Sequence, residues 1–207
     1  MAKVNWKGAT MLYPVPAVLV TTGNMEKSNV LTVAWVGIIS SDPPRAYISV
    51  RPERYSYEMI KETKEFCINL PTAAMTKELD YCGVKSGKDV DKFEYCKFTK
   101  GASPSISCPR IEESPISMDC KVFDIIDVGS HTMFLADILN VGVREELIDE
   151  TGKLNLAKSG LMAYSHGSYF KMGAKTGTFG FSVKKKVQRK VYPNSYGKSS
   201  AYDKKKK

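Results

Sequence analysis

Residues 29–51 read NVLTVAWVGIISSDPPRAYISVR, and this stretch decides how the chain folds. Val30–Ile39 is a nearly continuous apolar run, which predicts a strand buried on both faces. Asp42-Pro43-Pro44 ends that strand, because two consecutive prolines cannot continue it. Ala46–Val50 follows as a second, shorter strand. The stretch therefore predicts β structure at the centre of the fold.

Polar side chains follow the second strand at once. Ser49 and Arg51 close it, and the pattern after them predicts a helix over Ser56–Lys64, with Ser56 as its N-cap. A guanidinium fork, hydroxyls and the free N–H groups of a helix start are what a phosphate group needs. The segment thus indicates a phosphorylated ligand. These residues alone leave an alternative open, in which Ser56 only caps its helix and Arg51 only makes a surface ion pair.

A Gly-rich loop further along the chain extends the candidate phosphate site. It runs from Gly83 to Lys88, and Lys85, Ser86 and the later Lys92 add positive charge and hydrogen-bond donors. In the alternative interpretation this loop is simply solvated.

The rest of the chain is mostly strand-like. The sequence predicts strands, turns and one further helix as follows: strands at Ala17–Thr22, Phe66–Leu70, Ile116–Val122, His131–Val143 and Leu161–Tyr169, a turn at Val128-Gly129-Ser130, and a helix at Thr76–Cys82. Strands dominate and short helices interrupt them. An antiparallel barrel with helical insertions is the predicted fold, and the class is mainly β.

Composition suits a compact domain in a reducing compartment. The chain has 207 residues, of which 43% are hydrophobic. No apolar run approaches the length of a membrane span, and the N-terminus lacks the apolar core of a signal peptide, so we expect a cytoplasmic protein that does not bind membranes. The five cysteines form no Cys-x-x-Cys pair, which argues against a zinc or iron–sulfur site. Cys67 and Cys120 fall in strand patterns and are expected in the core.

The net charge of +9 does not indicate nucleic-acid binding, because of where the charge lies. Residues 183–207 carry ten basic residues and one acid, Asp203, whereas the other 182 residues hold 21 basic and 21 acidic residues. We therefore expect a neutral body, residues 1–182, and a basic, flexible tail, residues 183–207.

Common catalytic motifs are missing. The chain has no Gly-x-Ser-x-Gly elbow, no His-Glu-x-x-His pair, no Rossmann glycine fingerprint and no P-loop. Its two histidines are His131 and His166. No side chain is therefore predicted to act as a nucleophile or to bind a metal.

The ordered motifs together resemble one family, the flavin reductase-like FMN-binding split-barrel proteins, and within it the flavoredoxin branch. The resemblance covers roughly residues 8–180 and rests on these motifs: Asn29-x-x-Thr32-x-x-Trp35, Ser40-Ser41-x-Pro43-Pro44, Ser49-x-Arg51, Ser56-Tyr57-x-x-Ile60, Phe66-x-x-Asn69, Gly83-x-x-Ser86-Gly87 with Asp91-Lys92-Phe93, Gly129-Ser130-His131, and Tyr164 with Gly167-Ser168-Tyr169-Phe170. Each motif is weak alone, but their order and spacing are fairly specific.

The resemblance implies a six-stranded antiparallel Greek-key split barrel, a homodimer and a non-covalent FMN near the dimer interface. It also assigns cofactor-binding positions. The isoalloxazine lies along Asn29, Thr32, Ala34 and Trp35; the ribityl or phosphate side is Ser40 and Ser41; the phosphate side is Ser49, Arg51, Ser56 and Tyr57; and Lys92, His131 and Tyr164 surround the flavin. Lys92 or a protonated His131 is a candidate cation for stabilising the reduced flavin.

Two functions follow from this resemblance. One is an oxidoreductase that reduces FMN with NADH or NADPH as a transient donor. The other is a flavoredoxin-like carrier that keeps its FMN and passes electrons between redox proteins without reacting with NADH or NADPH.

Overall fold

The computed structural model describes residues 1–184, and the chain divides into two units, residues 1–173 and residues 174–207. The described part of the second unit holds one 3-10 turn, Phe181–Val183. The boundary predicted after residue 182 falls inside this second unit. Most of the predicted basic tail lies outside the described residues.

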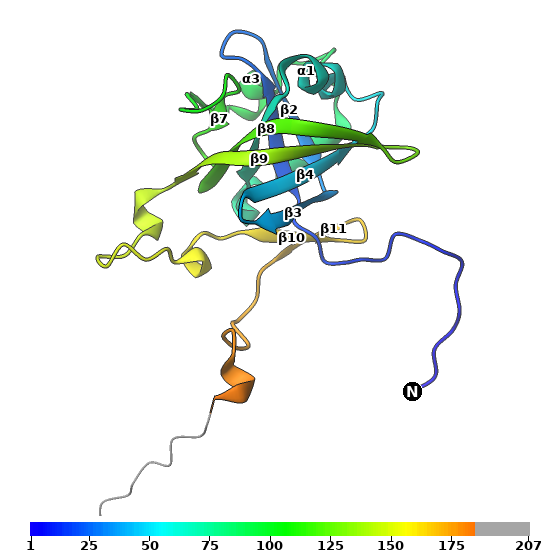
Figure 1. Ribbon diagram of the computed structural model, residues 1–207, viewed down its shortest axis with the longest axis vertical. Coiled ribbons are helices and arrows are strands. Elements are labelled where there is room, and N and C mark those ends of the chain that lie inside the picture. The colour runs from blue at the N-terminus through cyan, green and yellow to red at the C-terminus, as the bar shows by residue number, and fades with distance from the viewer. Residues whose placement is uncertain (185–207) are drawn as a thin grey trace, which may run out of the picture. The chain divides into compact units, whose positions relative to one another are not determined.

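One large antiparallel sheet dominates the first unit. In the described residues it has seven strands in the order β2-β1-β5-β8-β9-β4-β3, one more than expected. The bounds of these strands are β1 Val18–Gly23, β2 Ser28–Val33, β3 Val36–Ser41, β4 Pro44–Val50, β5 Glu65–Leu70, β8 Ile116–Asp127 and β9 Thr132–Val143. The long β8–β9 hairpin turns at residues 128–131, where the sequence predicted the turn, and its tip projects to the right in Figure 1.

The apolar run Val30–Ile39 does not form a single strand, and this prediction was wrong. The chain bends at Ala34 and Trp35, which separate β2 from β3, and no residue of β3 is buried, with Ile38 63% exposed. The two halves of the run have different environments. β2 is buried in the core, whereas β3 lies at the far edge of the sheet.

This bend closes the barrel. β2 and β3 are the two outer strands of the sheet, yet only two residues connect them. Three Cα–Cα steps span at most roughly 11 Å, so the two ends of the sheet must meet at this corner. The backbone N–H of Ser49 on β4 donates to the Trp35 carbonyl at 2.8 Å and fixes the corner. The expected split-barrel class is confirmed.

The first helix starts earlier than predicted. α1 spans Tyr55–Thr63, and Arg54, whose side chain makes no capping bond, occupies the N-cap. Ser56 lies within the first turn and is fully buried, so its predicted capping role was wrong. Its hydroxyl accepts a hydrogen bond from Asn29 Nδ2 at 2.8 Å instead. The helix thereby packs against the sheet rather than presenting Ser56 to solvent.

The remaining elements are short. They are the helices α2 Thr76–Val84 and α3 Lys92–Cys96, the small strands β6 Lys100–Gly101 and β7 Arg110–Ile111, and the 3-10 turns Ala73–Met75, Glu145–Leu147 and Leu156–Lys158. The expected strand at 161–169 is a separate hairpin, β10 Met162–Ser165 and β11 Ser168–Lys171. It turns at His166 and Gly167, which both have positive φ, as a tight two-residue hairpin turn requires.

Two large clusters of buried side chains form most of the core, and a small third one holds Cys67, Ile106 and Cys108. One large cluster lies inside the curled sheet and is closed by Tyr57 and Ile60 of α1; the second packs α2 and α3 against β1 and β2. Cys67 and Cys120 are buried, as expected. In the described residues, no helix is both long and apolar enough to cross a membrane. The second cluster matters for the site, because it fixes the end of α2 beside β2.

Candidate functional site

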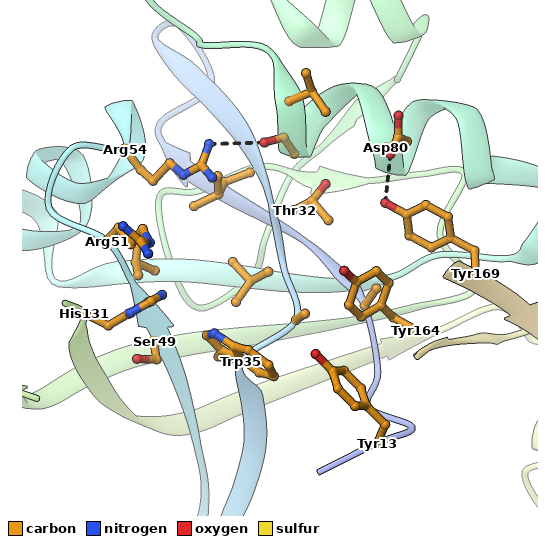
Figure 2. A pocket seen from close by; sticks show the side chains of 17 residues that line it. Tyr13, Thr32, Trp35, Ser49, Arg51, Arg54, Asp80, His131, Tyr164 and Tyr169 are labelled. Atoms are coloured by element: carbon orange, nitrogen blue, oxygen red, sulfur yellow. Dashed lines mark hydrogen bonds between the residues drawn. The ribbon is translucent and has the colours of Figure 1, made fainter. Parts of the chain in front are cut away.

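A pocket of about 410 Å³ opens at the bend that follows β2. Its volume falls within the range of small-molecule sites, roughly 300–1,000 Å³. The walls come from the segment before β1, the end of β2, the end of β4, the end of α2 and the β10–β11 hairpin. Segments far apart in the sequence therefore meet here, and Figure 2 shows their side chains converging on one space.

One end of the pocket is cationic. Arg51 and Arg54 lie in the loop between β4 and α1, and both line the pocket. Arg51 contacts Glu53 at 3.2 Å, but that pair is exposed, with 48% and 63% of the two side chains accessible. Arg54 donates to the Gly83 carbonyl at 3.2 Å (Figure 2). Because the Arg51–Glu53 pair is solvated, Arg51 stays available to an anion that enters the pocket.

His131 completes this end, together with Ser49. It lies in the turn just before β9, and its Nδ1 lies 2.9 Å from the Ser130 hydroxyl. Burial lowers the pKa of His131, and the nearby Arg51 lowers it further. The lowered pKa favours the neutral imidazole, so the positive charge at this end of the pocket comes from Arg51 and Arg54.

The other end of the pocket is aromatic. Trp35, Tyr13, Tyr164 and Tyr169 line it, and Figure 2 shows the three tyrosines on the side opposite the arginines. The Tyr13 ring lies 6.3 Å from Trp35 and 6.2 Å from Tyr164, while Tyr164 and Tyr169 are 5.5 Å apart, centroid to centroid. Such a cluster offers flat apolar surface with hydroxyls at its margin.

Two contacts hold the hairpin at the pocket. Val15 and Tyr164 exchange backbone hydrogen bonds of 2.9 and 2.8 Å, which ties the N-terminal segment to β10. The Tyr169 hydroxyl donates to Asp80 on α2 at 3.0 Å. Burial, and then this bond to Asp80, raise the pKa of Tyr169 to about 12. The phenol therefore stays protonated and keeps donating over the whole physiological range.

A second, smaller pocket of about 110 Å³ lies next to the first and shares Arg54, Leu31 and Val84 with it. Asn29 and Lys92 line this smaller pocket, as does the loop over residues 85–87. Lys92 is 3% exposed, and its ammonium donates to the Val30 carbonyl at 2.7 Å and the Cys82 carbonyl at 2.8 Å. Burial lowers the pKa of Lys92. This lysine joins β2 to α2, which the sequence did not predict.

The structure brings most of the predicted site residues together. Seven of them line the larger pocket: Thr32, Ala34, Trp35, Ser49, Arg51, His131 and Tyr164. Asn29 and Lys92 line the smaller one. Ser40, Ser41, Ser56 and Tyr57 line neither of the two. Ser40 and Ser41 end the outer strand β3, and Tyr57 is buried with its hydroxyl 3.1 Å from that of Thr132.

Sequence reasoning missed four polar or aromatic residues of the larger pocket: Tyr13, Arg54, Asp80 and Tyr169. Arg54 had a signal, since it is the second arginine just before a predicted helix. Tyr169 fell within a motif but received no role. Tyr13 and Asp80 had no sequence signal, because only the tertiary fold places them near β2.

The pocket therefore combines a cationic end, a stacking surface and the Ala34–Trp35 bend. It suits a planar ring system that carries an anionic group at one end. Among the residues that line it, no hydroxyl is hydrogen-bonded to a histidine, because the serine that contacts His131, Ser130, does not line the pocket.

Comparison with known proteins gives a matching family. The model described as "Flavin reductase like domain" matches residues 10–173, which is most of the chain. That range includes every residue that lines the two pockets.

Individual relatives and structures agree with this match. A protein of Pyrococcus abyssi without a characterised activity is 32% identical over 164 residues, covering 79% of this chain and 93% of the relative. An NADPH-flavin oxidoreductase of Streptomyces viridifaciens is 24% identical, covering 72% and 78%. The solved structure of flavoredoxin from Desulfovibrio vulgaris (Miyazaki F) superposes with a TM-score of 0.82 at 28% identity, covering 88% of this chain and all of that one.

Proposed function

The chain belongs to the flavin reductase-like family, and we propose that it binds FMN non-covalently and transfers electrons through it. One observation carries this proposal. The larger pocket has two arginines at one end and four aromatic side chains at the other. FMN has the matching asymmetry, with a phosphate at one end and a flat tricyclic ring at the other.

The residues suit the parts of FMN in the following way. Arg51 and Arg54, with Ser49 and His131, would hold the phosphate end. Trp35 and Tyr164 would pack beside the ring, and the backbone at the bend after β2 would meet its polar edge. Ser56 and Tyr57, which the sequence assigned to the phosphate, are buried in other contacts, so Arg54 takes their place in this proposal.

The bound flavin would supply the redox chemistry, taking up electrons from a donor and releasing them to an acceptor. The chain itself would bind the flavin, orient it and shield it from water. Arg51 neutralises the phosphate, the aromatic wall excludes water from one side, and Tyr169, fixed by Asp80, keeps that wall in place.

Arg51→Ala tests the phosphate role. We expect the variant to bind FMN about 10- to 100-fold more weakly, since a hydrogen bond to a charged group contributes roughly 1.5–3 kcal/mol. Riboflavin, which lacks the phosphate, should bind wild type and variant equally. Fluorescence titration of the apo-protein measures both affinities.

Arg45→Ala is the matched control, because Arg45 pairs with Asp137 outside the pocket. It should leave FMN affinity unchanged. Equal FMN affinity in wild type and Arg51→Ala would refute the phosphate role of Arg51, and a protein that never binds added FMN would refute the function.

Two roles in electron transfer have support from the relatives. The Streptomyces relative is named an NADPH-flavin oxidoreductase, which favours reduction by NADH or NADPH. The likeness to flavoredoxin favours a carrier that exchanges electrons with other redox proteins. We place the reductase first, because Tyr13, Tyr164 and Tyr169 add stacking surface to that of Trp35, and a nicotinamide ring would need such surface beside the flavin.

An anaerobic assay separates the two roles. Rapid loss of flavin absorbance after NADH or NADPH is added identifies a reductase. An unchanged spectrum, followed by reduction with a ferredoxin-type donor, identifies a carrier. The homodimer and the cytoplasmic location implied by the sequence stay predictions, and light scattering of the purified protein tests the first.

A further inference from the structure

Two cysteines that are far apart in the sequence meet at the back of the pocket wall. Cys82 lies near the end of α2 and Cys96 ends α3, and their sulfur atoms are 3.8 Å apart. All five cysteines lie in the described residues, and all are free thiols. The spacing of 14 residues carries no motif, so the sequence did not predict this pair.

The two helices are held together by more than this contact. Tyr81 and Tyr95, one residue before each cysteine, stack with their ring centroids 3.8 Å apart and an angle of 6° between the rings. Two consecutive pairs of side chains therefore connect α2 to α3. The stacked rings keep the two sulfur atoms facing each other, because neither helix can rotate without breaking the stack.

We propose that Cys82 and Cys96 form a redox modification site, which hydrogen peroxide closes to a reversible intrachain disulfide. A disulfide needs a sulfur–sulfur distance of about 2.05 Å, so the two atoms must approach by roughly 1.8 Å. Side-chain rotation together with a small shift of the short helix α3 provides this movement. The proposal does not depend on the flavin.

The chemistry balances with peroxide as the oxidant. Cys96 is partly exposed and reacts first: its sulfur attacks one peroxide oxygen, the O–O bond breaks, and water leaves to give a sulfenic acid. The buried Cys82 sulfur then attacks the Cys96 sulfur, the S–O bond breaks, and a second water carries away the thiol proton. Two thiols lose two electrons, and one peroxide gains them.

The pair is connected to the pocket through the end of α2. The Cys82 carbonyl accepts from Lys92, and the next residue, Gly83, accepts from Arg54. Gly83 and Val84 form part of the pocket wall. A disulfide would therefore fasten this wall to α3 and restrict the unfolded chain between residues 82 and 96.

The environment of the two thiols slows the reaction. Burial raises the pKa of Cys96, and Glu78 adds to this effect, while Lys92 and the contact with Cys82 oppose it. Burial likewise raises the pKa of Cys82, with Lys92 opposing. Because the thiolate is the reactive form, oxidation should accelerate as pH rises above the ordinary thiol value near 8.5.

Mass spectrometry of the peroxide-treated full chain tests the proposal. We expect the intact mass to fall by two hydrogens, a peptide map to link Cys82 to Cys96, and dithiothreitol to reverse the change. Cys82→Ser and Cys96→Ser should each abolish the link. Cys120→Ser is the matched control, since Cys120 is buried on β8 and its thiol donates to the Met118 carbonyl, and the variant should still form the Cys82–Cys96 link.

Other outcomes overturn the proposal: a mass that stays unchanged, a map that links other cysteines, a disulfide-linked dimer, or stable addition of oxygen to Cys96 in the wild type. Urea unfolding gives a second readout, in which the oxidised wild type should unfold at a higher urea concentration and the two serine variants should show no shift. Neither readout uses flavin, so a failed FMN titration would leave this result intact.

Discussion

The surroundings of His131 change the pKa of its imidazole. Burial and Arg51 both lower its pKa, whereas Glu53 acts in the opposite direction. Between the ordinary value near 6.5 and the lowered folded value, the unfolded chain binds a proton that the native chain does not. His131 therefore makes the protein less stable as pH falls through this window.

Arg51→Ala should raise the pKa of His131 towards its ordinary value, because the variant removes the nearest positive charge. Glu53→Gln should lower it further. An NMR titration of the imidazole C–H signals measures both shifts, and His166, the second histidine, provides the internal reference. Shifts of the same sign in the two variants would contradict this electrostatic account.

The β10–β11 hairpin is the element that completes the pocket. Its two strands form a sheet of their own, outside the large sheet of the described residues, and isolated bridges link it to Val15 and Thr72. Its attachment depends on the Val15–Tyr164 backbone bonds and on the Tyr169–Asp80 bond. An element with so few ties opens more readily than the sheet does.

Tyr169→Phe removes the bond to Asp80 and keeps the ring. A hydrogen bond of this kind contributes about 1 kcal/mol, so we expect amide hydrogen exchange in residues 162–171 to accelerate about fivefold. Exchange in β8 and β9 should not change. Tyr95→Phe is the control, since its ring stacks on Tyr81 away from the hairpin. Identical exchange in both variants would show that Tyr169 does not hold the hairpin.

At the scale of the whole molecule, a buried polar network connects distant parts of the fold. Arg110 on β7 donates two hydrogen bonds of 2.9 Å to Asp119 on β8 and one of 2.7 Å to Asn140 on β9. Asn69 on β5 accepts from the Ile111 backbone at 2.9 Å and from Ser117 at 2.7 Å. The network fixes the long connection between α3 and β8 against the sheet.

Asp119→Ala should lower the free energy of unfolding by about 3–5 kcal/mol, because it leaves the largely buried Arg110 without its carboxylate partner. The Asp119 side chain is 0% exposed. Asp137→Ala breaks a pair whose side chains are 36% and 37% exposed, and should cost about 0–1 kcal/mol. Urea unfolding compares the two variants, and equal losses would show that burial does not decide the strength of these pairs.

The sequence predicted most of the elements but not all of their limits. The β8–β9 hairpin was predictable because its alternating strands flank a Gly-Ser turn. The bend at Ala34 and Trp35 was not, since an apolar run looks the same whether it stays in one strand or passes from one edge of a sheet to the other. The sequence placed Ser56 at a helix start because serine is a preferred N-cap residue. Its buried contact with Asn29 depends on tertiary packing, which that local preference does not reflect.

By itself, the sequence determined the mainly β class, the position of most strands along the chain and the family, because these depend on local periodicity and on ordered motifs. Only the tertiary structure decided which residues share a pocket. It placed Tyr13, Arg54, Asp80 and Tyr169 beside Trp35, removed Ser56 and Tyr57 into the core, and brought the sulfur atoms of Cys82 and Cys96 together. The reason is physical: curling the sheet brings residues together by strand order and helix packing, and no local sequence pattern records those distances.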